Sequence, residues 1–131
     1  MPAGSLPRRS RVSVLIVDDA AMYRKAVRAL LERRGYSVVG EADRVATALN
    51  YVTRLAPDAV LLDINLPDGS GFDLAARLRD VRPEIAVLLT SSDFDQGFCA
   101  RAEAHGARGY VPKHRLRHVD FASFWPGASG K

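Results

Sequence analysis

The chain has 131 residues, which is enough for one domain with a single buried core. Apolar residues make up 47% and charged residues 26%, a composition that fits an ordinary globular protein and excludes a disordered or fibrous chain. The net charge is +4, but basic and acidic residues are interleaved and form no compact basic cluster, so we expect no direct nucleic-acid binding by this chain.

The N-terminal segment, residues 1–10, is rich in proline, glycine, serine and arginine, which predicts a tail outside the folded domain. It lacks the apolar run of a signal peptide, and no later segment is apolar for long enough to span a membrane. The single cysteine, Cys99, has no partner for an internal disulfide, which fits a reducing compartment. We therefore expect a cytoplasmic protein.

The first predicted strand is an almost unbroken apolar run, residues 12–17, that ends in two adjacent carboxylates, Asp18 and Asp19. A run of this kind predicts a strand that is buried on both faces, as in parallel sheets. The next stretch, residues 20–35, has a helical period and closes at Gly35, with apolar positions at Met22, Ala26, Ala29 and Leu30.

The same alternation of strand and helix continues to the end of the chain. Further strands are predicted over residues 36–41, 58–63, 84–90 and 108–112, and further helices over residues 44–57, 71–81, 95–106 and 115–125. In the helix over residues 44–57, the apolar positions Val45, Ala48, Leu49 and Val52 share one face.

The last predicted helix, residues 115–125, has two possible packings for its aromatic residues. Leu116, Val119 and Ala122 recur at a spacing of three and are expected to face the sheet. Phe121 and Phe124 would then point elsewhere, either folding back over the edge of the core or forming an exposed interaction face. Trp125 would lie at the edge of that face.

Five strand–helix units predict an α/β fold with a doubly wound, five-stranded parallel sheet and helices on both faces. The carboxyl ends of parallel strands meet at one edge of the sheet, where ligands bind in such folds. Asp18, Asp19, Asp63, Thr90 and Lys113 are therefore expected to converge there. Each residue alone fits ordinary turn or surface chemistry, but together they predict a functional site.

Four sequence pieces follow one another along the chain: IVDDA, LLDINLPDGSG, LLTSS and GARGYVPK. Together, in this order, they resemble the receiver domain of two-component response regulators, the CheY-like family. The resemblance implies the flavodoxin-like strand order 2-1-3-4-5 and a receiver domain over residues 11–125, with residues 126–131 as a tail or linker remnant.

The resemblance implies that Asp63 is the phosphoacceptor, taking a phosphoryl group from a phosphohistidine on a sensor histidine kinase or a phosphotransfer protein. It also implies a Mg²⁺ ion held directly by Asp19 and Asp63, through water by Asp18, and by the backbone carbonyl of Asn65. Members of this family are signalling phosphoacceptors that catalyse only their own phosphorylation and dephosphorylation.

Three further roles follow from the same resemblance. Lys113 would pair with the acceptor carboxylate and then with a phosphoryl oxygen, and Thr90 would hydrogen-bond another phosphoryl oxygen. Tyr110 is either a strand aromatic or the switch residue that turns inward when the threonine moves. The face made by the fourth helix, the fifth strand and the fifth helix would then serve for homodimerisation or partner binding.

One departure from the common family pattern and two alternative functions remain. The order Pro112, Lys113, His114 differs from the usual lysine followed by proline and resembles regulators that carry a helix-turn-helix output domain. A phosphohydrolase of the haloacid-dehalogenase type would need a second aspartate two positions after the nucleophile, where this chain has Asn65. A receiver-like interaction module that no longer takes phosphate is the other alternative.

Overall fold

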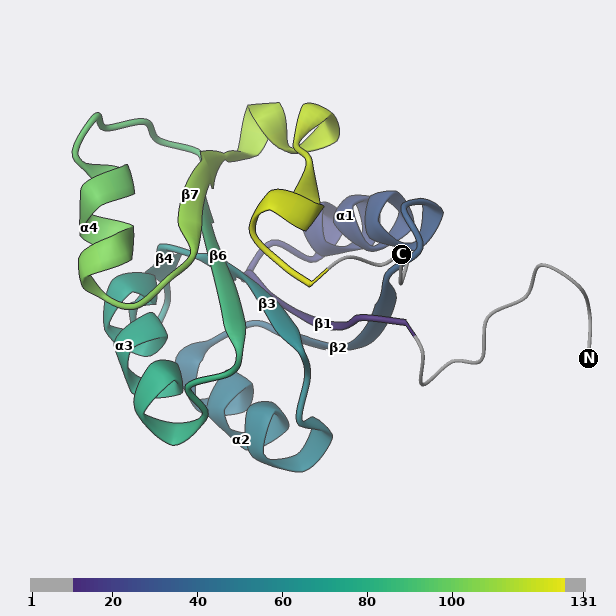
Figure 1. Cartoon of the computed structure of the whole chain (residues 1–131), viewed down its shortest axis with the longest axis horizontal. Coiled ribbons are helices and arrows are strands. Elements are labelled where there is room, and N and C mark those ends of the chain that lie inside the picture. Colours follow the sequence, from purple (N-terminus) through teal and green to yellow (C-terminus); the bar gives the residue numbers. More distant parts are fainter. Residues whose placement is uncertain (1–10, 127–131) are drawn as a thin grey trace, which may run out of the picture.

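The computed structural model describes residues 11–126 and shows a five-stranded parallel sheet between two layers of helical segments (Figure 1). The predicted N-terminal tail and residues 127–131 lie outside the described residues. Over the part that the structure describes, no helix is long and apolar enough to cross a membrane. The sheet has the order β2-β1-β3-β6-β7, which confirms the doubly wound order 2-1-3-4-5. Its strands are β1 (Ser13–Val17), β2 (Ser37–Ala42), β3 (Ala59–Asp63), β6 (Ala86–Ser91) and β7 (Gly109–Pro112).

The central strands are apolar throughout because both of their faces are buried. In β1, Leu15 and Val17 point into one core cluster, whereas Val14 and Ile16 point into the other. The strands β3 and β6 alternate in the same way. This two-sided burial is the reason that an unbroken apolar run, and not an alternating one, encodes these strands.

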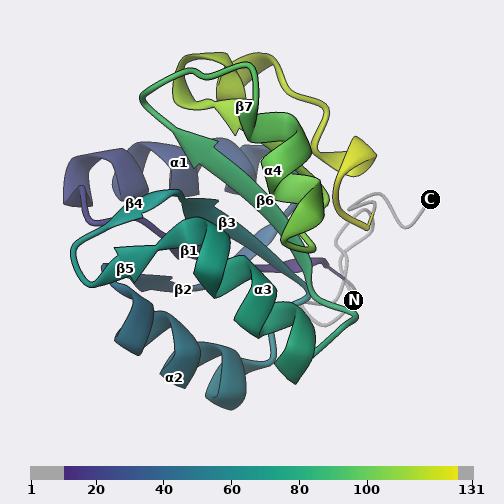
Figure 2. The same ribbon diagram turned by 90° about the vertical axis from the view of Figure 1, so that its left-hand side faces the viewer.

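The helical elements divide between the two faces of the sheet. One face is covered by α2 (Val45–Leu55), α3 (Gly71–Val81) and α4 (Phe98–Ala104), as Figure 2 shows. The other is covered by α1 (Ala21–Arg33) and the C-terminal segment of the chain. In α2 the predicted face is confirmed, because Ala48 and Val52 are buried and two flanking residues pack against the same cluster.

Of the apolar positions expected on one face of α1, Leu30 packs against the core, but Ala26 and Ala29 are exposed. Met22 is 80% exposed, whereas Val27 and Leu31 are buried against the sheet. Small alanine side chains recur along this helix and blur its apolar period, so the sequence could not define which stripe of the helix faces inward. The correction places Tyr23 on the inner side of α1, where it packs against the core.

A short hairpin that the sequence analysis missed follows β3. It pairs β4 (Asn65–Leu66) with β5 (Gly69–Ser70) in antiparallel fashion. Between its strands, the Asp68 carboxylate accepts hydrogen bonds from the backbone N–H groups of Val45 and Ala46, at 2.7 and 3.1 Å, and so caps the start of α2. Two-residue strands carry almost no periodic signal, which explains the omission.

The C-terminal segment is not the continuous helix predicted over residues 115–125. It consists of two 3₁₀ segments, η2 (Lys113–His118) and η3 (Phe121–Ser123), separated by extended backbone at Val119. The Arg34 guanidinium, from the end of α1, donates hydrogen bonds to the carbonyl groups of Arg117 and Val119, and these contacts favour the break. The Asp120 carboxylate accepts from the N–H of Ala122 and starts the second segment.

Of the two packings left open for the aromatic residues of this segment, folding back over the core is confirmed for Phe121, and Phe124 packs against the same cluster, whereas the expected place of Trp125 at the edge of an exposed face was wrong. Phe121 and Trp125 are each 2% exposed and stack on one another, with ring centroids 4.9 Å apart. Tyr36 meets both rings edge-on. Trp125 therefore belongs to the core beside α1 and does not lie at the edge of the face around α4 and β7. Of the three residues expected to face the sheet, Leu116 is buried, while Ala122 is exposed.

The buried position of Phe121 leads to a test by unfolding. We expect Phe121→Ala to lower the free energy of unfolding by about 3 kcal/mol or more, because a large ring is lost from a stacked cluster. The control is Phe94→Ala, whose ring is 65% exposed and whose loss is expected to cost less than about 0.5 kcal/mol. Urea denaturation of the two variants measures the difference, and equal stability would contradict the packing described here.

Candidate phosphoacceptor and metal site

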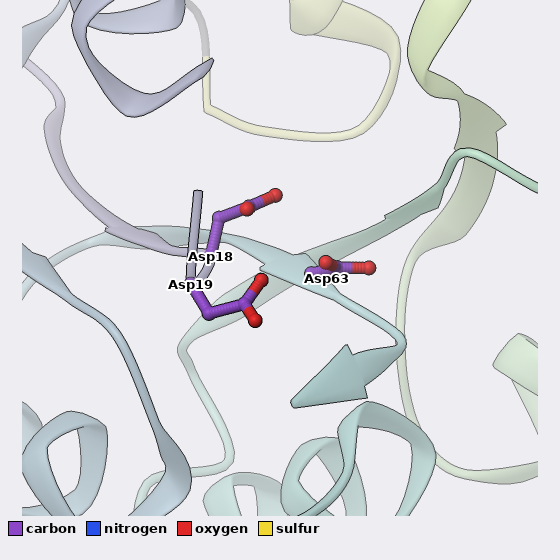
Figure 3. Close-up of side chains that lie close together, drawn as sticks. All are labelled: Asp18, Asp19 and Asp63. Atoms are coloured by element: carbon purple, nitrogen blue, oxygen red, sulfur yellow. The ribbon is translucent and has the colours of Figure 1, made fainter. Parts of the chain in front are cut away.

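Three carboxylates meet at the carboxyl edge of the sheet, as the strand-end argument predicted (Figure 3). Asp18 and Asp19 follow β1, and Asp63 is the last residue of the neighbouring strand β3. Each residue offers one carboxylate oxygen, and these three atoms lie within 4.8 Å of one another. Asp18 and Asp63 are buried, whereas Asp19 is exposed, so the cluster opens to solvent on one side.

Local hydrogen bonds fix the orientation of the two buried carboxylates. Asp18 Oδ1 accepts from the N–H of Ala20, at 2.9 Å, just before α1 begins. Asp63 Oδ1 accepts from the N–H of Asn65, at 3.2 Å. Each carboxylate thus has one oxygen tied to the loop that follows its strand, which leaves its other oxygen directed at the remaining partners of the site.

The residue directly after the hairpin, Gly71, lies too close to the end of β3 for any side chain. A Cβ atom at this position would lie 2.3 Å from the carbonyl oxygen of Asp63, which is far inside van der Waals contact. The N–H of Gly71 also donates to the carbonyl of Ile64, at 2.6 Å. Only glycine permits this close approach of α3 to the end of β3.

Lys113, which follows β7, supplies a positive charge to the cluster. Its Nζ lies 2.6 Å from Asp18 Oδ2 and 3.4 Å from Asp63 Oδ2. Burial opposes the charged form, but the two carboxylates outweigh burial and raise the pKa of Lys113 above its usual value. The predicted pairing of Lys113 with Asp63 is present, but the shorter contact is with Asp18, which the sequence did not indicate.

One ammonium does not balance three carboxylates. Burial and repulsion from Asp18 raise the pKa of Asp63 above its usual value, even though Lys113 and the N–H of Asn65 act in the opposite direction. A nearby cation would therefore stabilise the ionised carboxylate of Asp63. The donors are hard oxygen atoms from acidic side chains, the ligand type that Mg²⁺ prefers, so the residues present fit a divalent metal site.

Thr90 and Tyr110 connect the site to β7. Thr90 lies beside Asp63 in the parallel register, and its buried hydroxyl donates to the carbonyl of Val111, at 2.7 Å. The side chain of Tyr110 is only 6% exposed, and its hydroxyl donates to the carbonyl of Asp93, at 2.6 Å. In this structure the threonine hydroxyl is therefore bonded to β7, while the tyrosine lies inward.

Sequence analysis missed one side chain of the site, Tyr23 of α1. The Lys113 ammonium lies 4.2 Å from the centroid of the Tyr23 ring, which is a cation–π contact. Burial, together with the charge on Asp18, raises the pKa of Tyr23 above its usual value. Tyr23 could not be found from its sequence because its place follows from the orientation of α1, and that orientation was predicted incorrectly.

The comparisons with known proteins agree with this geometry. The sequence profile of the response regulator receiver domain matches residues 14–118. The chain is 38% identical over 127 residues to the nitrate/nitrite response regulator protein NarP of Escherichia coli, covering 95% of this chain and 59% of NarP. It is 32% identical over 100 residues to the chemotaxis protein CheY of Thermotoga maritima, covering 76% of this chain and 83% of that protein.

A solved structure of a receiver domain has the same fold as this chain. The signal receiver domain of NarL from Mycobacterium tuberculosis superimposes with a TM-score of 0.76 at 34% identity, covering 82% of this chain and 87% of that one. The chain spans about half the length of the first curated relatives that it matches. Because the profile covers well over half of the chain and the fold and the carboxylate cluster agree with it, the chain belongs to the response regulator receiver domain family.

Proposed function

We propose that this domain accepts a phosphoryl group on Asp63 from a phosphohistidine of a sensor histidine kinase or phosphotransfer protein, in a Mg²⁺-dependent reaction. The observation that supports this most is the placement of Asp63, a buried strand-end carboxylate with two further carboxylates and the Lys113 ammonium around it. An isolated structural aspartate would not be surrounded by other carboxylates, because like charges at this distance repel.

In the proposed transfer, a carboxylate oxygen of Asp63 forms a bond to phosphorus. The bond between phosphorus and the histidine nitrogen breaks, and the imidazole leaves with its electron pair and takes up a proton. The Lys113 ammonium lies 3.4 Å from Asp63 Oδ2 and can follow that oxygen to contact the transferred group. Thr90, next to Asp63 in register, can turn its hydroxyl from Val111 to a phosphoryl oxygen.

Mg²⁺ would be held by Asp19, Asp63 and the backbone carbonyl of Asn65, with Asp18 acting through water, and would neutralise charge on the phosphoryl oxygens. The contacts of Asp18 support its indirect role, because one oxygen accepts from Ala20 and the other lies 2.6 Å from Lys113. Asp19 is exposed, so its carboxylate is free to reach an ion from the solvent side.

The proposed setting is a two-component pathway. The kinase that phosphorylates such a domain uses ATP, so we propose that the domain works in the cytoplasm. Curated relatives include transcription regulators, and the order Pro112, Lys113, His114 fits that group, so an output by transcription control is the proposal for the whole protein. Family membership leaves the haloacid-dehalogenase alternative without support. A module that no longer takes phosphate remains the alternative against which the proposal is tested.

The first test of this function is phosphorylation by a small donor. We expect incubation with acetyl phosphate and Mg²⁺ to add the mass of one phosphoryl group, and Asp63→Asn to abolish the addition while the domain stays folded. Intact-mass spectrometry measures the addition, and circular dichroism checks the fold of the variant. Omission of Mg²⁺ is the control. A label on any residue other than Asp63, or none at all in the wild type, would contradict the proposal.

The second test concerns the metal. We expect Asp19→Asn to weaken Mg²⁺ binding about tenfold or more, because it removes a direct charged ligand, and Asp18→Asn to weaken it less. Mg²⁺ titration followed by NMR chemical shifts gives both affinities. Asp80→Asn is the matched control, since Asp80 is an exposed aspartate near the end of α3. Wild-type affinity in Asp19→Asn would rule out the ligand set.

Output through the face made by α4, β7 and the C-terminal segment is also part of the proposal. An open pocket on this face is lined by the exposed Phe94, the half-buried Phe124 and the buried Tyr110. Tyr110 ties this face to the site, because its hydroxyl bonds to the loop that leads from β6 to α4 and its backbone belongs to β7, next to the Val111 carbonyl that accepts from Thr90. We propose that a homodimer or a partner uses this face after phosphorylation.

The third test follows from that coupling. We expect beryllofluoride, a phosphoryl mimic, to raise self-association or partner affinity when added with Mg²⁺, and Thr90→Ala to remove the effect, because the hydroxyl that senses the phosphoryl group is absent. Sedimentation analysis measures the mass in solution. Thr53→Ala is the control, since the hydroxyl of Thr53 only bonds along α2. An effect that persists in Thr90→Ala would exclude Thr90 as the switch.

A further inference from the structure

The strongest feature outside the assigned site residues is Tyr23, on the inner side of α1. It contacts the site through the face of its ring, whose centroid lies 4.2 Å from the Lys113 ammonium nitrogen. Its hydroxyl oxygen is buried and, among the residues that the structure describes, has no hydrogen-bond partner. A buried hydroxyl without a partner destabilises the state in which it occurs, so a tyrosine here has a disadvantage that a phenylalanine would not have.

The ring contact matters because Lys113 also borders a pocket into which its side chain could move. Tyr23 and Lys113 both line a pocket of about 230 Å³ between α1 and η2, whose other walls include Val27, Leu30 and Leu116. The lysine side chain is 16% exposed. A flexible lysine beside such a pocket can leave the carboxylates unless something favours its position over them. The negative face of an aromatic ring provides that attraction.

We propose that Tyr23 is a positioning residue of this site: its ring holds the Lys113 ammonium on the carboxylates of Asp18 and Asp63. This inference rests on the proposed phosphoacceptor function and deepens it. It assigns to α1 a side chain that acts on the lysine, which follows β7.

The ring contact can be tested in the resting protein, without any phosphoryl mimic. Protons above an aromatic face resonate upfield, so we expect upfield shifts for the ε-methylene protons of Lys113 in the wild type and in Tyr23→Phe. In Tyr23→Leu, which keeps an apolar side chain but no ring, these protons are expected at ordinary positions. Unshifted protons in the wild type would overturn the inference, whether or not the domain accepts phosphate.

The functional consequence is measured with beryllofluoride and Mg²⁺. We expect Tyr23→Leu to weaken beryllofluoride binding about threefold to tenfold, the factor that corresponds to a partly buried cation–π contact. In a Lys113→Met background, which keeps the length of the side chain but removes the charge, Tyr23→Leu should have no further effect. A full effect in that background would show that Tyr23 acts through packing and not through Lys113, and would overturn the inference.

Tyr23→Phe is the matched control, because it keeps the ring and loses only the hydroxyl. We expect this variant to bind beryllofluoride as the wild type does and to raise the thermal stability of the resting domain, because the unpartnered hydroxyl is gone. A loss of binding as large as in Tyr23→Leu would show that the ring contact is not what matters, and would overturn the inference. Failure of the wild type itself to bind beryllofluoride would refute the phosphoacceptor proposal, and the proton shifts of Lys113 would still decide the ring contact.

Discussion

The arrangement of charge at the carboxyl edge of the sheet is the constraint on which the site depends. Two adjacent strands, β1 and β3, end in carboxylates, and parallel pairing brings these ends together whether or not the charges repel. Lys113 relieves part of the repulsion through its 2.6 Å contact with Asp18. Its longer contact with Asp63 leaves that carboxylate only partly neutralised, so a nearby cation can still stabilise it. The negative charge of the three carboxylates is therefore only partly neutralised in the resting structure.

The surrounding structure keeps this unneutralised cluster in place. Each buried aspartate has one oxygen bonded to a backbone N–H two residues later, at Ala20 or Asn65. Gly71 lets α3 approach the end of β3 more closely than any other residue would allow. Asp18 and Asp63 themselves are buried beside the paired strands β1 and β3, so the carboxylates cannot separate without displacing these strands from the core. The repulsion is thus offset by the hydrophobic packing of the two clusters on either side of the sheet.

The strand-end argument predicted the site well because it depends only on topology. Apolar runs buried on both faces identify β1, β3 and β6, and the strand order then brings Asp18, Asp63 and Thr90 to one edge. The contacts that involve side-chain direction could not be predicted in this way. The shorter contact of Lys113 with Asp18 depends on the direction of the lysine side chain, and the place of Tyr23 depends on how α1 is rotated, which the recurring alanines of that helix leave open. The C-terminal segment depends on contacts from Arg34, more than eighty residues earlier.

The two layers differ in how easily they can respond to a change at Thr90. The residue Val111, whose carbonyl accepts from Thr90, faces the cluster of Tyr36, Phe121 and Trp125, where three rings pack against one another. Its neighbour on β7, Tyr110, faces the opposite layer and bonds to the exposed loop over residues 92–97, ahead of the seven-residue helix α4. Few buried contacts hold that loop, so the free energy of moving it is small. A rotation of Thr90 is therefore expected to displace the α4 side while the aromatic cluster stays in place.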